Sequence, residues 1–154
     1  MDLEVKPADQ NHLQFAWQLY SNFVQTNLFS GGASLRRPEE WNEKAEFDKF
    51  QAYWNGEDRY VILVDNSPIG WVAIDKTDKK ITIENWHLVP EWRGKDVTKI
   101  ILSDLVPKWK SQGLEIEAAI LQNATMTSIA EAALTHVGFS MDRIEQHSKI
   151  MRVR

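Results

Sequence analysis

Glu84 is the residue whose type and position best suit acid–base chemistry in this chain. Side chains alternate along a strand, so Thr82, Glu84, Trp86 and Leu88 share one face of a predicted strand. A carboxylate among such neighbours is a candidate general base. The alternative interpretation is an ordinary strand glutamate that faces water.

Other kinds of reactive site find little support. The chain has no cysteine, which excludes disulfides, thiolate metal sites and cysteine nucleophiles. The four histidines (His12, His87, His136 and His147) lack metal-ligand spacing and are interpreted as surface or core residues. There is no P-loop and no G-x-S-x-G elbow. We therefore expect no bound metal. The seven tryptophans suggest packing, or alternatively an aromatic recognition surface.

Length and composition predict one globular domain over residues 1–154. Hydrophobic residues make up 43% and charged residues 26%, which is ordinary for a folded protein. A net charge of −4 and a pI near 5.6 argue against a general nucleic-acid binder. No apolar run approaches the ~18 residues that a membrane span needs, and the first residues lack the apolar segment of a signal peptide. We expect a cytoplasmic protein with no nucleic-acid or membrane partner.

The pattern of apolar residues predicts the elements that would position Glu84. Strands are expected at residues 3–7, 60–64, 69–74, 81–88, 114–122, 139–144 and 149–153. Helices are expected at residues 13–24, 38–54, 97–111 and 128–138. Strands 81–88 and 114–122 should be parallel neighbours, because a helix lies between them in the chain. The order of elements predicts an α/β (α+β) domain with a mixed, twisted central sheet flanked by helices.

Three short motifs resemble the GCN5-related N-acetyltransferase (GNAT) family, in the right order and over nearly the whole chain. One is similar to the family's fourth strand and cofactor loop, V-x-P-E-[YW]-R-G-K. It is the run Leu88-Val89-Pro90-Glu91-Trp92-Arg93-Gly94-Lys95. The other two are similar to the third strand and to the closing G-F. They are Ile69-Gly70-Trp71 and Val137-Gly138-Phe139. The resemblance implies the GNAT fold.

The same resemblance implies a coenzyme A site in the loop before helix 97–111. In the family, backbone N–H groups of a [QR]-x-x-G-x-[GA] loop hold the pyrophosphate at a helix N-terminus. The cofactor-binding residues implied here are Leu88, Val89, Arg93, Gly94, Lys95, Asp96, Val97 and Thr98. The implied cofactor is acetyl-CoA or another acyl-CoA.

The chain departs from the family pattern at three positions. Asp96 and Thr98 stand where the loop has small residues, and Leu134 stands where the family usually has a tyrosine acid. A carboxylate at Asp96 could cap the N–H groups that a pyrophosphate would use, and would repel the phosphates. Arg93, Lys95 and Lys99 could offset part of that repulsion. Under the alternative interpretation, Asp96 is simply a helix cap and no cofactor binds.

The resemblance implies an acyl-CoA-dependent N-acyltransferase, most simply an acetyltransferase, acting on an amine of a small molecule or protein. Glu84 would be its base, although the family's frequent glutamate position aligns with Thr82. Trp86 and Asn123 would contact the acceptor. The main alternative is a non-catalytic binding or structural module, similar to the eroded GNAT-like proteins of some bacteriophages. A lesser alternative is transfer of an acyl group that is bound to a carrier protein. The oligomeric state stays open, a homodimer included.

Overall fold

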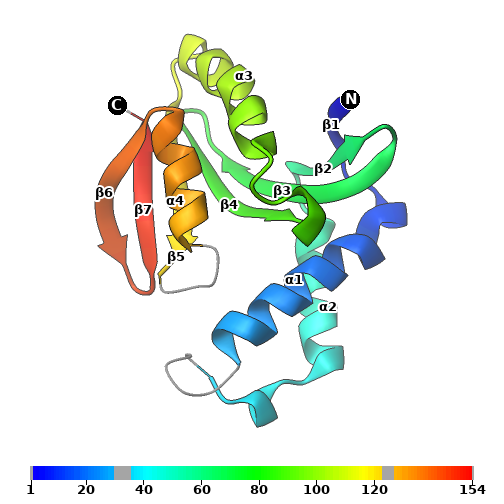
Figure 1. The fold of residues 1–154 in the computed structure, drawn as a ribbon. Helices are drawn as coiled ribbons and strands as arrows, with labels where there is room; N and C mark the ends of the chain where they lie inside the picture. The colour runs from blue at the N-terminus through cyan, green and yellow to red at the C-terminus, as the bar shows by residue number, and fades with distance from the viewer. Residues whose placement is uncertain (1, 30–35, 123–126, 154) are drawn as a thin grey trace. The chain divides into compact units, whose positions relative to one another are not determined.

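The strands and helices follow one another in the predicted order. The computed structural model describes residues 2–29, 36–122 and 127–153. Its strands are β1 (Leu3–Pro7), β2 (Arg59–Val64), β3 (Ser67–Lys76), β4 (Lys80–Leu88), β5 (Glu115–Leu121), β6 (Phe139–Glu145) and β7 (Ser148–Val153) (Figure 1). Its helices are α1 (Leu13–Leu28), α2 (Glu43–Trp54), α3 (Val97–Ser111) and α4 (Thr127–His136), with 3₁₀ turns at Gln10–His12, Pro38–Glu40 and Pro90–Trp92.

The seven strands form one mixed sheet with the order β1-β2-β3-β4-β5-β7-β6. β4 and β5 are parallel, as predicted from the helix between them. The pairs β1/β2, β5/β7 and β6/β7 are antiparallel. Contacts divide the chain into an N-terminal part (Met1–Val72 with His87–Val89) and a C-terminal part (Ala73–Trp86 with Pro90–Arg154).

The second helix begins later than predicted. Residues Pro38–Glu40 form a 3₁₀ turn, and Trp41 then returns to an extended conformation with φ −69° and ψ 122°. Helix α2 starts at Glu43, because the Asn42 side chain accepts a hydrogen bond from the backbone N–H of Ala45 at 3.0 Å. The prediction of a helix from residue 38 was wrong, because it took proline at the first turn as the start and overlooked the asparagine cap.

Trp71 of β3 is at the centre of the aromatic core of the N-terminal part and is fully buried. Its ring lies 5.5 Å from both Phe50 and Trp54 of α2, and 4.8 Å from His87, measured between ring centroids. Four of the seven tryptophans in the chain are buried, which supports the packing interpretation of these residues. The buried tryptophans are Trp17, Trp54, Trp71 and Trp109.

Gly70 lets β3 and β4 approach closely in the N-terminal part. A Cβ at this position would overlap the backbone oxygen of His87 and would lie 2.6 Å from Leu88 Cδ2. The neighbouring backbone continues the contact, since the N–H of Val89 donates to the Ile69 carbonyl oxygen at 2.8 Å. A backbone atom in a sheet cannot move aside as the end of a flexible side chain can.

We therefore expect Gly70→Ala to destabilise the protein by roughly 1–3 kcal/mol, the usual cost of overpacking. Urea unfolding followed by circular dichroism would measure the change. Ser67→Ala, at the exposed start of the same strand, is the matched control and should stay within about 0.5 kcal/mol of wild type. Equal stability of the two variants would show that β3 and β4 can separate without cost.

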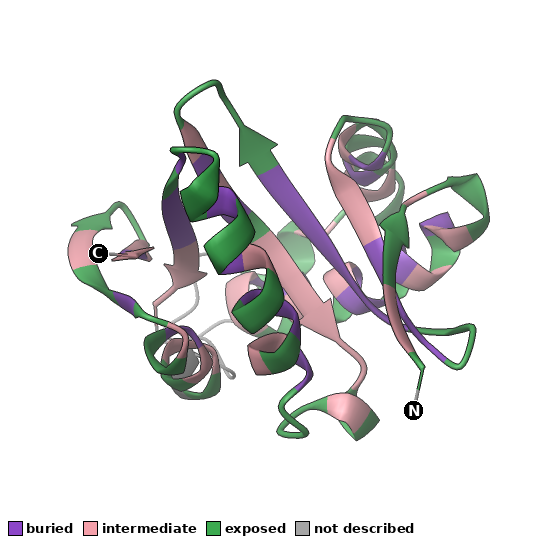
Figure 2. Ribbon diagram, turned by 90° about the horizontal axis from the view of Figure 1, so that it is seen from above, coloured by how far each residue is buried: buried purple, intermediate pink, exposed green. Residues whose placement is uncertain are grey.

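Buried and polar side chains alternate along β4 and β5 of the C-terminal part. The buried apolar residues of the paired strands are Ile81, Ile83, Ile116 and Ala118, here called the apolar face. The residues between them are Lys80, Thr82, Glu115 and Glu117, here called the polar face. Helices α3 and α4 both lie against β5 (Figure 1). Figure 2 shows the buried inner and exposed outer sides of the helices.

A β-bulge interrupts the pairing of β6 with β7. Met141 pairs with Met151, but the next paired residue, Arg143, lies opposite Ile150. Asp142 is therefore an extra residue that the register with β7 passes over.

The bulge determines on which face of the sheet each of the following side chains lies. Ile144 pairs with Lys149, whose ammonium lies 3.1 Å from the Glu131 carboxylate of α4. Ile144 therefore lies on the same side of the sheet as the apolar face and α4. Arg143 reaches Glu117 on the polar face instead. If Asp142 were instead paired with Ile150 in a regular ladder, Arg143 and Ile144 would exchange faces.

Candidate functional site

Glu84 is the first residue of β4 beyond the paired stretch of the two parallel strands. The register of β4 with β5 ends at Ile83 opposite Ala118. The Glu84 side chain is exposed, whereas Ile81 and Ile83 before it are buried. The Glu84 carboxylate is therefore not enclosed by apolar side chains. Its exposure makes it accessible to an incoming molecule.

Trp86 lies on β4 two residues after Glu84 and is half-buried. Its indole Nε1 is buried and has no hydrogen-bond partner among the residues that the structure describes. A buried N–H without a partner is costly, so a bound polar group that accepts this hydrogen would be favoured. Asn123, the other residue predicted to contact an acceptor, lies outside the described residues.

Leu88 and Val89 belong to the N-terminal part and are both half-buried. The Leu88 side chain packs at the position that a Cβ of residue 70 would occupy. The Val89 N–H is bonded to Ile69, as described above, so it donates within the sheet. Contacts with β3 therefore fix the positions of both residues at the end of β4.

The loop that follows contains two residues in the left-handed conformation. Gly94 has φ +76° and Asp96 has φ +63°, and helix α3 begins at Val97. A Cβ at Gly94 would meet no atom within 4 Å, so the space beside the loop is open. Arg93, Lys95 and Asp96 are exposed, Thr98 is half-buried and Val97 is buried beneath them.

Asp96 occupies the N-cap position of α3, but its side chain makes no capping hydrogen bond. The capping interpretation was therefore wrong. The reason lies in the backbone, because a helix cap needs an extended conformation and Asp96 is left-handed. Its carboxylate lies 3.3 Å from the Lys99 ammonium instead. The carboxylate thus does not cap the first N–H groups of α3 and pairs with a cation one turn along the helix.

Basic side chains outnumber acidic ones in this segment. Arg93, Lys95 and Lys99 carry three positive charges against two negative charges of Glu91 and Asp96, a balance of +1 between residues 91 and 99. The Lys95 ammonium lies over the Trp92 ring, 5.2 Å from its centroid. N–H groups at a helix start that Asp96 does not cap, an open space beside Gly94 and a net positive charge together suit an anion such as a pyrophosphate.

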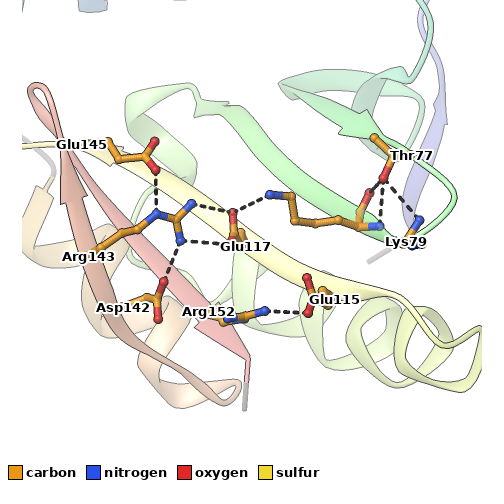
Figure 3. Close-up of polar contacts among 9 residues, drawn as sticks. Thr77, Lys79, Glu115, Glu117, Asp142, Arg143, Glu145 and Arg152 are labelled. Atoms are coloured by element: carbon orange, nitrogen blue, oxygen red, sulfur yellow. Dashed lines mark hydrogen bonds and ion pairs between the residues drawn. The ribbon is translucent and has the colours of Figure 1, made fainter.

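An ion cluster around one buried carboxylate lies on the polar face of the C-terminal part. Glu117 is 5% exposed, and its two carboxylate oxygens lie 3.1 and 3.3 Å from the guanidinium nitrogens of Arg143. Lys80 of β4 approaches the same carboxylate at 3.3 Å. Figure 3 shows that Arg143 also contacts Asp142 and Glu145, both at 2.6 Å. The sequence alone did not predict this cluster; its one signal was the alternation of Glu115 and Glu117 with apolar residues at the start of β5.

The cations determine the protonation of Glu117. Hydrogen bonds from Arg143, and then the nearby Lys80, hold the pKa of Glu117 below its ordinary value of 4.5, although burial acts in the opposite direction. Glu117 in turn raises the pKa of Arg143. Because folding lowers the pKa of Glu117, its contribution to stability is present above the ordinary value. That contribution is lost as the pH falls through the lowered one.

We therefore expect Glu117→Gln to lower the free energy of unfolding at pH 7, and the difference from wild type to shrink as the pH falls below about 4.5. Urea unfolding at a series of pH values measures both quantities. Glu115→Gln is the control, because Glu115 is exposed and pairs with Arg152 at 2.7 Å in an ordinary surface ion pair. A pH-independent effect of Glu117→Gln would mean that the carboxylate is not ionised in the fold.

The surroundings of the remaining candidate residues favour structural roles for them. Leu134 of α4 is 7% exposed and offers no acidic hydrogen at the position of the family's usual tyrosine. The ring of His87 stacks on Trp71 and meets Phe23 at 5.1 Å, which favours its interpretation as a core histidine. Within residues 2–29, 36–122 and 127–153, no group of three His, Asp or Glu side chains could hold a metal ion. No described helix is both long and apolar enough to span a membrane.

Solved structures with similar folds cover almost all of this chain. One is the PaiA N-acetyltransferase of Thermoplasma acidophilum in complex with coenzyme A, with a TM-score of 0.69, 14% identity, and 100% of this chain and 99% of that chain aligned. A GNAT-family acetyltransferase of Bacillus anthracis has a TM-score of 0.68, 12% identity, and 99% and 95% coverage. A domain from Methanocaldococcus jannaschii has a TM-score of 0.68, 20% identity, and 99% and 97% coverage.

Sequence comparison gives a family but no near relative. No curated protein sequence matches this chain significantly. The family described as "Acetyltransferase (GNAT) family" matches residues 26–134, which is well over half of the chain. The expected fold is confirmed by the structural likeness, and the expected family by this match. The chain belongs to the GNAT acetyltransferase family and has its fold.

Proposed function

We propose that this protein is an acyl-CoA-dependent N-acyltransferase, most simply an acetyltransferase, acting on an amine of a small molecule or a protein. The observation that carries the proposal is the loop before α3. Its backbone is left-handed at Gly94 and Asp96, and no Asp96 cap covers the helix start. Family membership supplies the reaction class. The alignment of whole chains supports the accompanying proposal that residues 1–154 work as a single domain.

The cofactor would be held mainly by the start of α3. Backbone N–H groups from Gly94 to Thr98 would donate to the pyrophosphate, with Val97 anchoring the helix in the core. Arg93 and Lys95 would supply positive charge. Leu88 and Val89 would border the rest of the cofactor at the end of β4. When bound, the cofactor supplies an acyl group activated as a thioester.

Glu84 would act as the general base. Its exposed carboxylate, directly or through one water, would take the proton from the acceptor amine and leave the nitrogen lone pair free to attack. Trp86 would orient a polar group through its buried indole N–H, which has no partner among the described residues. Asn123 is the second proposed acceptor contact. Leu134 cannot donate a proton, so the proposal assigns no side chain to the leaving thiol.

A second candidate function is a non-catalytic binding module. The Asp96–Lys99 ion pair favours it, because it places a negative charge beside the helix start and occupies a cation that a phosphate could use. The apolar Leu134 at the position of the family's usual tyrosine also favours the binding module. The two candidates differ in one measurable property, which is affinity for coenzyme A.

Calorimetric titration of the purified protein with acetyl-CoA separates them. We expect saturable binding of acetyl-CoA in the micromolar range. Arg93→Ala should abolish or strongly weaken this binding. Both proteins should be titrated at low and at high salt. Incubation with acetyl-CoA and a panel of amines would then identify the acceptor class, with mass spectrometry detecting which amines become acetylated. Absence of binding at millimolar acetyl-CoA would overturn the enzyme and favour the module.

A further inference from the structure

The C-terminal part exposes two large apolar side chains on β6, its outermost described strand, and one at the start of α4. Met141 and Ile144 of β6 are 42% and 57% exposed, and Ile129 at the start of α4 is 52% exposed. The β-bulge places Met141 and Ile144 on the same face. Their partners on β7 are Met151 and Lys149, which are two residues apart and so point to one side. We call Met141 and Ile144 the edge patch.

We propose that the edge patch joins two copies of this chain through antiparallel pairing of β6 with β6. β6 ends the strand order among the described strands, so one side of its backbone can pair with another strand. A twofold axis normal to the sheet keeps both apolar faces on the same side of the extended sheet. The edge patches of the two copies would then meet across the axis and leave water together.

The sequence of β6 is self-complementary about such an axis. With the axis between Asp142 and Arg143, each of these residues lies opposite the oppositely charged residue of the second copy. Met141 then lies opposite Ile144, so the apolar side chains also match. A pairing in which like residues face one another would bring equal charges together. The arrangement of two apolar residues around an acidic–basic pair thus selects a second copy over an unrelated strand.

The opposite edge of the sheet lacks these properties. β1 carries one exposed apolar side chain, Val5 at 40%, between Glu4 and Lys6, which pair with each other at 3.3 Å. Pro7 ends the strand and has no N–H to donate. Charges and proline are usual means of preventing edge pairing. The association is therefore assigned to β6, and it does not depend on the proposed function.

Sedimentation equilibrium of the full chain at roughly 1–100 µM tests the proposal, because a dimer's stability depends on protomer concentration. We expect wild type to approach twice the 17.8 kDa of one chain. Ile144→Asp should weaken association by about 30-fold or more, the effect of losing a central interface residue. The carboxylate that this substitution introduces would face Lys149, so the hairpin should stay folded. Met141→Gln is a second variant that removes apolar area without adding charge.

Val5→Asp is the matched control, since it places the same charge on the other edge strand. It should leave the mass unchanged, and circular dichroism should show all three variants folded. A wild-type monomer throughout this range would overturn the proposal and would mean that the bulge and charges of β6 prevent pairing. A dimer that Val5→Asp dissociates, or that neither β6 variant affects, would also overturn it.

Discussion

Glu84→Gln should lower the turnover of the acyl transfer by roughly 10²–10⁴, the usual effect of removing a general base. Glutamine keeps the size and polarity of the side chain, but it cannot accept the proton of the amine. The affinity for acetyl-CoA should change little, because Glu84 is on β4 and the proposed phosphate contacts are on the loop before α3. Initial rates and calorimetric titration on the same preparation measure the two quantities.

Glu115→Gln provides the control for this experiment. Glu115 is exposed on the neighbouring strand and belongs to the polar face, as Thr82 and Lys80 do. Its loss removes one negative charge from that face without removing the proposed base, so turnover should stay within about threefold of wild type, the range that a weak surface ion pair allows. Equal turnover of Glu84→Gln and wild type would mean that another group, or water, takes the proton.

Asp96→Gly should raise the affinity for acetyl-CoA on the order of tenfold. Removing the carboxylate abolishes its repulsion of the phosphates and frees the Lys99 ammonium, now 3.3 Å away. The gain is limited, because the Asp96 side chain is 65% exposed and water and salt screen its charge. Helix α3 should not weaken, since no capping bond is lost and glycine accepts a φ of +63° more readily than aspartate.

Two further variants separate charge from backbone in that experiment. Asp96→Asn removes the charge but keeps a side chain that tolerates the left-handed conformation, so it should give most of the gain in affinity. Asp104→Asn is the matched control, because Asp104 pairs with Lys108 at 3.0 Å further along α3. Titrations at low and high salt should converge if repulsion is the cause. If Asp96→Gly binds no better than wild type, the carboxylate does not face the phosphates.

The sequence predicts the parallel pair β4/β5 well, because its signals are local. Apolar periodicity locates the helix between the strands, and the observed bounds of α3, Val97–Ser111, are those predicted. The motif around Gly70 marked a strand, and the structure adds the reason for a glycine there, the close backbone of residue 87. Such features depend on residues that are near one another in the chain.

The features that the sequence did not predict depend on distant residues or on backbone conformation. Glu117 alternates with apolar residues along β5, as a surface residue of a strand does. It is nevertheless buried, and it pairs with Lys80 and Arg143, which are 37 and 26 residues away in the sequence (117 − 80 and 143 − 117). At Asp96 the residue type suggested a cap, but a left-handed backbone directs the carboxylate elsewhere. Residue type alone cannot distinguish these two conformations of aspartate.

The extra residue in β6 also bears on how sequences of this family are aligned. Because Arg143 lies opposite Ile150 and Ile144 opposite Lys149, deleting Asp142 would leave both residues on their present faces and would remove only the bulge and one carboxylate of the ion cluster. A relative one residue shorter at this point could therefore still pair Arg143 with Glu117. When sequences of the family are aligned, a single gap at position 142 would then mark a straighter strand with one negative charge fewer, and not a change in which side chains face α4.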